Sequence, residues 1–159
     1  MFKEVMFLSA EQMALVRPAQ DTVVISILDR SEEAHRPDLT GFRDSLPLQF
    51  EDVDESYWYD PPGSWPDEPT LTEHLRLSRT GCEIVPSLSH ARAIVSFLEK
   101  HHQTFDQLSL VVHCKGGISR SAAVAAWASK RYWAPITSIR SPEYANPRLL
   151  QLLDKAAST

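Results

Sequence analysis

Residues 108–121 read LSLVVHCKGGISRS, and this stretch decides the fold. Leu108 to His113, with Leu108, Leu110, Val111 and Val112, predicts a central strand. Ala122 to Tyr132 is rich in small residues and predicts a helix that packs closely on that strand. A short glycine-bearing loop joins the two. A strand, such a loop and a helix form a cradle for phosphate, because loop N–H groups and the helix N-terminus point at one place.

The segments outward from this stretch alternate between strand and helix patterns. The predicted strands are Val5 to Leu8, Val23 to Leu28 and Leu46 to Phe50, and the predicted helices are Glu11 to Val16, Leu88 to His101 and one that starts at Asn146-Pro147. Pro47 has no N–H to donate, so it indicates an edge or a strand start. We expect an α/β fold: a single three-layer domain over residues 1–159, with a central, mostly parallel sheet flanked by helices.

Composition and charge narrow the classes of function. Of the 159 residues, 43% are hydrophobic and 23% charged, and the net charge is -5. We therefore expect neither nucleic acid nor an anionic membrane as the main partner. Glu4, Glu11 and Arg17 interrupt the apolar residues of the N-terminal stretch, and no run approaches the about 20 apolar residues of a membrane span. The two cysteines, Cys82 and Cys114, make no disulfide framework, so a reducing compartment, the cytoplasm, is expected.

Residues 55–86 are the least regular part and predict a loop insertion within the domain, with a helical turn over Leu71 to Leu77. The segment holds five of the eleven prolines and the aromatic residues Tyr57, Trp58, Tyr59 and Trp65. Two interpretations stay open for these rings. They form a lid that stacks on a substrate ring, or, as we favour, they cover one flank of the core.

The segment from His113 to Ser121 reads HCKGGISRS, with five residues between the cysteine and the arginine. It resembles the signature of the protein tyrosine phosphatase superfamily: HC, five residues, R, then S or T. The lead-in LVVHC and the ending GISRS are similar to the compact dual-specificity branch and its small bacterial relatives. The resemblance implies that Ser121 hydrogen-bonds the catalytic sulfur and that His113 buttresses the loop. It also implies a phosphate-binding loop made of Lys115, Gly116, Gly117, Ile118, Ser119 and Arg120.

The chemistry of a phosphate monoester explains these residue types independently. The dianion repels nucleophiles, so a site that attacks it has to neutralise its charge. Arg120 supplies a planar, permanently charged fork for two phosphate oxygens. A cysteine beside such donors and at a helix N-terminus favours the thiolate. We therefore predict Cys114 as the nucleophile, with neither a metal nor another cofactor.

The leaving group needs a proton, which a carboxylic acid on a separate loop usually donates. The candidates are Asp52, Asp54, Asp60 and Asp67. We rank Asp52 first, because in the compact branch the acid follows the strand before the long helix, and LPLQFED at residues 46–52 has that layout. Asp67 ends the WPD tripeptide that names this loop in the larger tyrosine-specific enzymes, but the residues after it lack the usual glycine and second proline. Asp54 and Asp67 stay open as alternatives.

The expected function is a protein tyrosine or dual-specificity phosphatase that acts on a phosphorylated protein or peptide through a phosphocysteine. A catalytically weak phosphate-recognition module is one alternative. A phosphoinositide phosphatase is another, although such enzymes tend to carry a second basic residue within the loop, where only Lys115 is present. A redox or sulfur-transfer enzyme would leave the spacing from Cys114 to Arg120 unexplained. A disulfide between Cys82 and the oxidised nucleophile also stays open.

Overall fold

The chain folds around a four-stranded sheet. The computed structural model describes residues 1–158, and its strands stand in the order β1-β4-β2-β3. The strands are β1 (Phe2–Ser9), β2 (Thr22–Leu28), β3 (Asp44–Gln49) and β4 (Leu108–Cys114). The helices are α1 (Ala10–Met13), α2 (Leu71–Leu77), α3 (Leu88–His102), α4 (Arg120–Tyr132) and α5 (Pro147–Ala157), with two 3-10 helices, η1 (Arg30–His35) and η2 (Glu55–Trp58). Every strand pair is parallel, so the carboxyl ends of the strands meet at one edge of the sheet.

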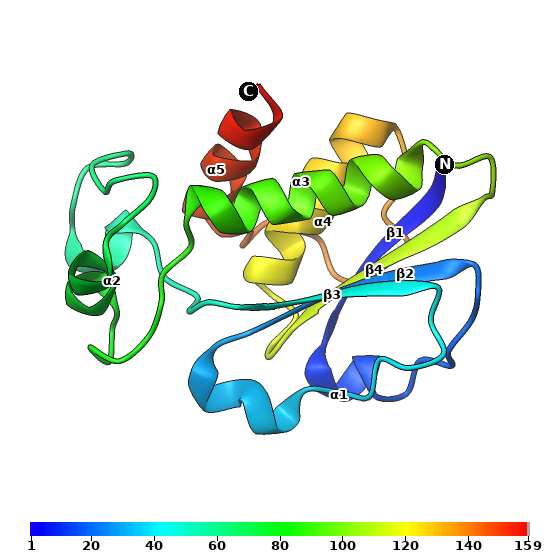
Figure 1. Cartoon of the computed structure of the whole chain (residues 1–159), viewed down its shortest axis with the longest axis horizontal. Coiled ribbons are helices and arrows are strands. Elements are labelled where there is room, and N and C mark those ends of the chain that lie inside the picture. The colour runs from blue at the N-terminus through cyan, green and yellow to red at the C-terminus, as the bar shows by residue number, and fades with distance from the viewer. Residues whose placement is uncertain (159) are drawn as a thin grey trace.

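The sheet separates two helical layers of unequal thickness (Figure 1). Helices α3, α4 and α5 cover one face, and α4 packs directly on β1 and β4. The short α1 and η1 lie on the other, thin face. Side chains alternate between the faces along each strand. In β2, Ile25 and Ile27 enter the large core and Val24 enters the small one. The predicted α/β fold with three layers is confirmed.

The predicted elements are present, with differences at their ends. β4 lies between β1 and β2, and Pro47 lies in β3, at the edge of the sheet. α4 begins at Arg120, earlier than the predicted Ala122, because the glycine loop runs directly into the helix. α1 ends at Met13, short of the predicted Val16. None of the helices in residues 1–158 has the length and apolar character that crossing a bilayer requires.

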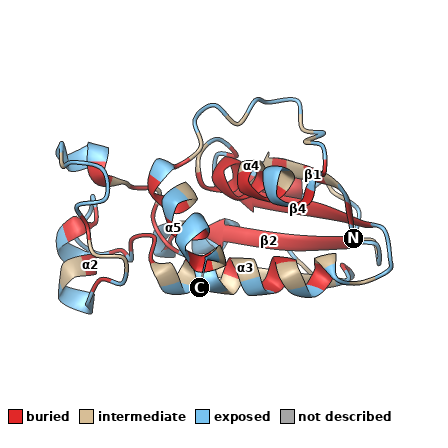
Figure 2. Cartoon of the chain, turned by 90° about the horizontal axis from the view of Figure 1, so that it is seen from above, coloured by how far each residue is buried: buried red, intermediate tan, exposed pale blue. Residues whose placement is uncertain are grey.

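The insertion forms a small unit beyond the carboxyl edge of the sheet, with α2 as its helix (Figures 1 and 2). It has a hydrophobic cluster of its own, made of Val53, Trp65, Leu77 and Val85. Trp65 is 4% exposed, and its ring faces the guanidinium of Arg148. The predicted stacking of Trp65 on a substrate ring is therefore wrong, because the ring is buried and packs against other residues of the protein.

Arg148 ties this unit to α5. Its Nη1 lies 3.2 Å from the carboxylate of Glu55, and both side chains are buried. Its Nε and Nη2 donate to the carbonyls of Pro86 and Pro66 at 2.8 and 2.9 Å. A buried guanidinium with all these partners satisfied fixes the insertion against the rest of the domain.

Candidate active site

Cys114 is the last residue of β4, and its thiol lies in the concave side of the loop that follows. The residue is 2% exposed. The backbone N–H of Gly117 donates to Sγ at 3.2 Å, and Oγ of Ser121 lies 3.1 Å from the same sulfur. The positive end of the α4 dipole is at the same place. These contacts hold the sulfur at the N-terminal end of α4, facing the N–H of Gly117.

Gly117 lies where the loop turns sharply back toward α4. Its φ is +66°, in the left-handed region. A Cβ on this residue would lie 2.6 Å from the carbonyl carbon of Leu8 and would also meet the backbone nitrogen of Ser9. The loop is held there by a bond from the N–H of Ala10 to the carbonyl of Lys115 at 3.2 Å. Only glycine fits this close approach of the loop to the end of β1.

Arg120 is the first residue of α4 and is 4% exposed. Its Nη1 donates to the carbonyl of Phe50 at 2.9 Å, and its Nη2 donates to Glu32 at 3.0 Å. Its Nε is buried and has no hydrogen-bond partner among residues 1–158. A buried N–H without an acceptor costs roughly 1–3 kcal/mol, so this position favours binding of an oxyanion that can accept from it.

Asp52 follows β3 and lies against the loop. Its Oδ1 accepts from Oγ of Ser119 at 2.7 Å and from Nδ2 of Asn146 at 2.9 Å. Asn146 is the N-cap of α5, and its N–H donates to the carbonyl of Ser119 at 3.1 Å. Both contacts of the carboxylate are made by Oδ1, which leaves Oδ2 as the oxygen able to carry a proton.

The other three acid candidates make contacts away from the loop. Asp60 accepts the N–H of the Trp65 indole at 3.0 Å, within the insertion. Asp54 caps η2 by accepting the N–H of Ser56 at 2.8 Å. Asp67 pairs with Lys155 at 2.8 Å, near the C-terminal end of α5. Asn146 marks the opposite end of that helix, so Lys155 lies roughly 13 Å along the axis from the contact with Asp52. Of the four carboxylates, Asp52 is the one with a hydrogen bond to the cysteine loop.

His113 lies behind the loop and is fully buried. Its Nδ1 lies 3.3 Å from the carbonyl oxygen of Cys114, and its Nε2 lies 2.6 Å from Oγ of Ser26. Burial lowers the pKa of His113 to about 4, and the positive charges of Arg36 and Arg120 act in the same direction. The ring is therefore neutral near pH 7, with one donor and one acceptor nitrogen.

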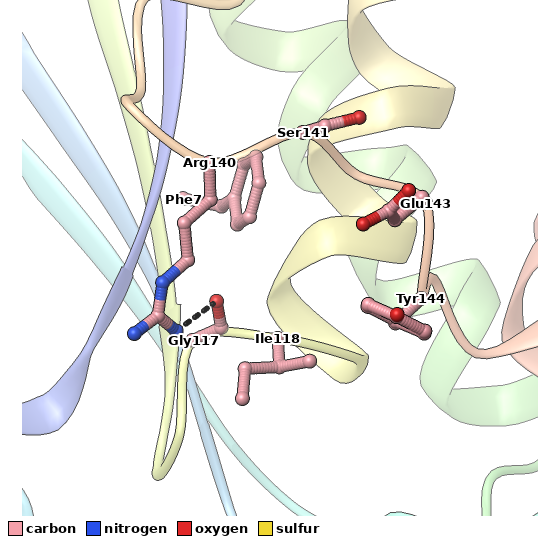
Figure 3. A pocket seen from close by; sticks show the side chains of 7 residues that line it. All are labelled: Phe7, Gly117, Ile118, Arg140, Ser141, Glu143 and Tyr144. Carbon is pink, nitrogen blue, oxygen red and sulfur yellow. Dashed lines mark hydrogen bonds between the residues drawn. The ribbon is translucent and has the colours of Figure 1, made fainter.

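A pocket of about 220 Å³ adjoins the outer side of the loop (Figure 3). Arg140 comes from the connection between α4 and α5, and its Nη1 donates to the carbonyls of Gly116 and Gly117 at 3.0 and 3.4 Å. Ile118 and Tyr144 face the pocket from the loop and from that connection (Figure 3). Arg140 thus binds two loop carbonyls on the outer side, while the N–H of Gly117 faces the sulfur on the inner side.

Three residues that contact the site were not predicted as site residues from the sequence: Glu32, Asn146 and Arg140. Asp29 and Glu32 form a capping box on η1, so the D-x-x-E spacing was a readable signal for a helix start. The bond from Glu32 to Arg120 joins residues far apart in the chain, and no local pattern encodes it. Asn146 was predicted as a helix cap, and its second contact, with Asp52, is equally non-local.

The remaining candidate residues lie as follows. Lys115 is half-buried and Ile118 is 46% exposed at the rim of the loop. Cys82 is exposed in the insertion, and both cysteines are free. Within residues 1–158, no group of three or more His, Cys, Asp or Glu side chains is placed to hold a metal ion.

The chain was also compared with known proteins. A scan of protein-family models found no match, and neither did searches of curated proteins and of solved structures. The site consists of a glycine-bearing loop between β4 and α4 that surrounds a buried thiol.

Proposed function

We propose that this chain is a cysteine-dependent phosphoric monoester hydrolase of the protein tyrosine phosphatase type. One observation carries the proposal: Cys114 and Arg120 are buried at the two ends of one loop, and Nε of Arg120 has no hydrogen-bond partner within the described residues. A thiol that accepts a loop N–H, beside a cationic donor in need of an acceptor, suits a tetrahedral oxyanion. In this proposal, a phosphoryl group bound to that donor faces the sulfur.

In the first step, the Cys114 thiolate attacks phosphorus, and the bond from phosphorus to the leaving oxygen breaks. Arg120 and the loop N–H groups stabilise the charge on the three non-bridging oxygens. Asp52 donates its proton to the leaving oxygen from Oδ2. The contacts of its Oδ1 with Ser119 and Asn146 support this role, because they hold the carboxyl group at the loop.

In the second step, water attacks the phosphocysteine and gives its proton to Asp52. The sulfur leaves as a thiolate, and inorganic phosphate is released. Ser121 lies 3.1 Å from that sulfur, so its hydroxyl can donate to the leaving thiolate. The cycle returns every group to its starting protonation state and needs no oxidant or other co-reactant.

We propose a phosphorylated protein or peptide in the cytoplasm as the substrate. The choice of peptide over phosphoinositide depends on Lys115 being the one basic residue between Cys114 and Arg120. The choice of compartment depends on two free cysteines, one of which has to stay reduced to act.

Hydrolysis of p-nitrophenyl phosphate in the presence of EDTA tests this proposal. We expect turnover that EDTA leaves unchanged. We expect Cys114→Ser to abolish it, while phosphate binding, measured by calorimetry, is retained. Binding of phosphate to the wild-type protein without turnover would instead support a recognition module. Loss of turnover on chelation would contradict the proposed mechanism.

A further inference from the structure

Three polar side chains form a line of hydrogen bonds behind the cysteine loop, on the thin face of the sheet. Ser26 of β2 and His113 of β4 are partners in adjacent strands, and both are 0% exposed. Their side chains meet with Oγ 2.6 Å from Nε2. Arg36 follows η1 and reaches the same hydroxyl with Nη1 at 2.7 Å, with its side chain 15% exposed. The line ends at the carbonyl of Cys114.

The carbonyl at the end of this line determines which atom donates in each of its hydrogen bonds. The carbonyl oxygen of Cys114 only accepts, so His113 carries its proton on Nδ1. The neutral ring then presents Nε2 as an acceptor, and the hydroxyl of Ser26 donates to it. The oxygen of Ser26 in turn accepts from Arg36, whose guanidinium has donors and no acceptor. Each bond therefore has one consistent direction, from the cation to the backbone of the nucleophile.

We propose that Arg36 and Ser26 are positioning residues for the nucleophile, which act through His113 to hold the Cys114 carbonyl away from the anion site. With that carbonyl held, the peptide plane after Cys114 turns its N–H toward the inner side of the loop. The consequence for turnover rests on the proposed phosphatase function. The consequence for the reactivity of the thiol does not, and it is measured separately.

The cation at the start of the line also matters for charge. Hydrogen bonds in series polarise one another in a low-dielectric interior, so a guanidinium at one end strengthens the bonds that follow. The positive ends of these dipoles point toward Cys114, which favours its thiolate. Glu33 pairs with Arg36, accepting from its Nη2 at 3.0 Å, and offsets part of its charge. The other charged groups around the loop are not members of this line: Arg120, Glu32, Asp52, Lys115 and Arg140.

Arg36 has a second set of contacts that are structural only. Its Nη1 donates to the carbonyl of Ser26 at 2.8 Å, and its Nη2 donates to the carbonyl of Leu48 at 3.1 Å. These bonds join the carboxyl ends of β2 and β3. Ser26→Ala removes the line to His113 and keeps both carbonyls, so it separates the two roles. Arg36→Met removes both roles.

The test measures alkylation of Cys114 by iodoacetamide as a function of pH, in a Cys82→Ser background so that one thiol reacts. The variants are Ser26→Ala, Arg36→Met and Ser26→Thr. Arg43→Met serves as the matched control, because Arg43 pairs with Asp106 on the surface. Thermal unfolding of each variant, and kcat/KM for p-nitrophenyl phosphate against pH, are measured alongside.

We expect the midpoint of the alkylation profile to rise by about 0.5–1 pH unit in Ser26→Ala and Arg36→Met, less than the about 1–3 units that an adjacent charge produces. The acid limb of kcat/KM should move with it, while Ser26→Thr and Arg43→Met stay at the wild-type midpoint. An unchanged midpoint in both variants, with only a lower unfolding temperature, would overturn the inference. If Ser26→Ala does not fold, the midpoint of Arg36→Met decides. If the wild-type protein does not turn over p-nitrophenyl phosphate, the proposed function is wrong, but the alkylation midpoints still test the inference.

Discussion

Replacing Gly117 by alanine tests the claim that the loop geometry makes the site. An alanine there would hold a left-handed φ of +66°, which costs about 1–2 kcal/mol for a residue with a Cβ. The Cβ would also lie 2.6 Å from the carbonyl carbon of Leu8, and a backbone neighbour has no rotamer that relieves the contact. Overpacking of this kind adds roughly 1–3 kcal/mol. We expect a total loss of roughly 2–5 kcal/mol in the free energy of unfolding.

Gly116→Ala is the matched control, because a Cβ at Gly116 would meet only the side chain of Ile118 at 3.8 Å. At about 2–4 °C per kcal/mol for a chain of this size, Gly117→Ala should unfold roughly 4–20 °C below wild type, with Gly116→Ala close to wild type. A loop displaced by about 1 Å loses on the order of 100-fold in rate, so kcat/KM for p-nitrophenyl phosphate should fall at least that far in Gly117→Ala alone. Equal stability and activity of the two variants would refute the reasoning.

Three further predictions concern ionisable side chains at the site. Glu32→Gln replaces a charge-assisted bond to Arg120 by a neutral one, weaker by about 1 kcal/mol, so kcat/KM should fall about fivefold, with Glu73→Gln in α2 as an unchanged control. Asp52→Asn should slow hydrolysis of phenyl phosphate, which has a poor leaving group, about 100-fold or more. Hydrolysis of p-nitrophenyl phosphate, which has a good leaving group, should slow far less, and Asp54→Asn and Asp67→Asn should leave both rates unchanged. Equal losses on the two esters would show that Asp52 is not the acid. The pKa of His113 is about 4 in the folded protein and 6.5 in the unfolded chain. Between pH 6.5 and pH 4 the unfolded chain therefore binds a proton that the folded protein does not. As the pH falls through this range, the free energy of unfolding should decrease by about 3 kcal/mol from its value above pH 6.5. Denaturant unfolding of wild type and His113→Gln should show that difference, and parallel pH curves would rule it out.

The fold was readable because its signals are local. The apolar run of β4, the small residues of α4 and the cap and proline of α5 each lie within one segment of sequence. Alternation along β2 and β4 decides which side chains face each layer. It is why Cys114 faces the large core and α4, while its neighbour His113 faces the thin layer.

The candidate site was readable only in part, for the same reason. Cys114 and Arg120 belong to one short motif, and the structure places them at the two ends of the loop between β4 and α4. The partners of that loop come from distant segments: Glu32 from η1, Arg36 after it, and Asn146 before α5. Their contacts depend on tertiary packing, which no spacing in the sequence encodes. The literal WPD tripeptide pointed to Asp67, but its carboxylate pairs with Lys155 instead.

The central claim is that Cys114 becomes covalently phosphorylated during turnover. The direct measurement is acid quenching of the enzyme with a ³²P-labelled aryl phosphate, followed by digestion and identification of the labelled peptide. We expect label on the peptide that contains Cys114, and none in Cys114→Ser. Steady turnover with no label on that peptide, or label retained in Cys114→Ser on another residue, would contradict the account.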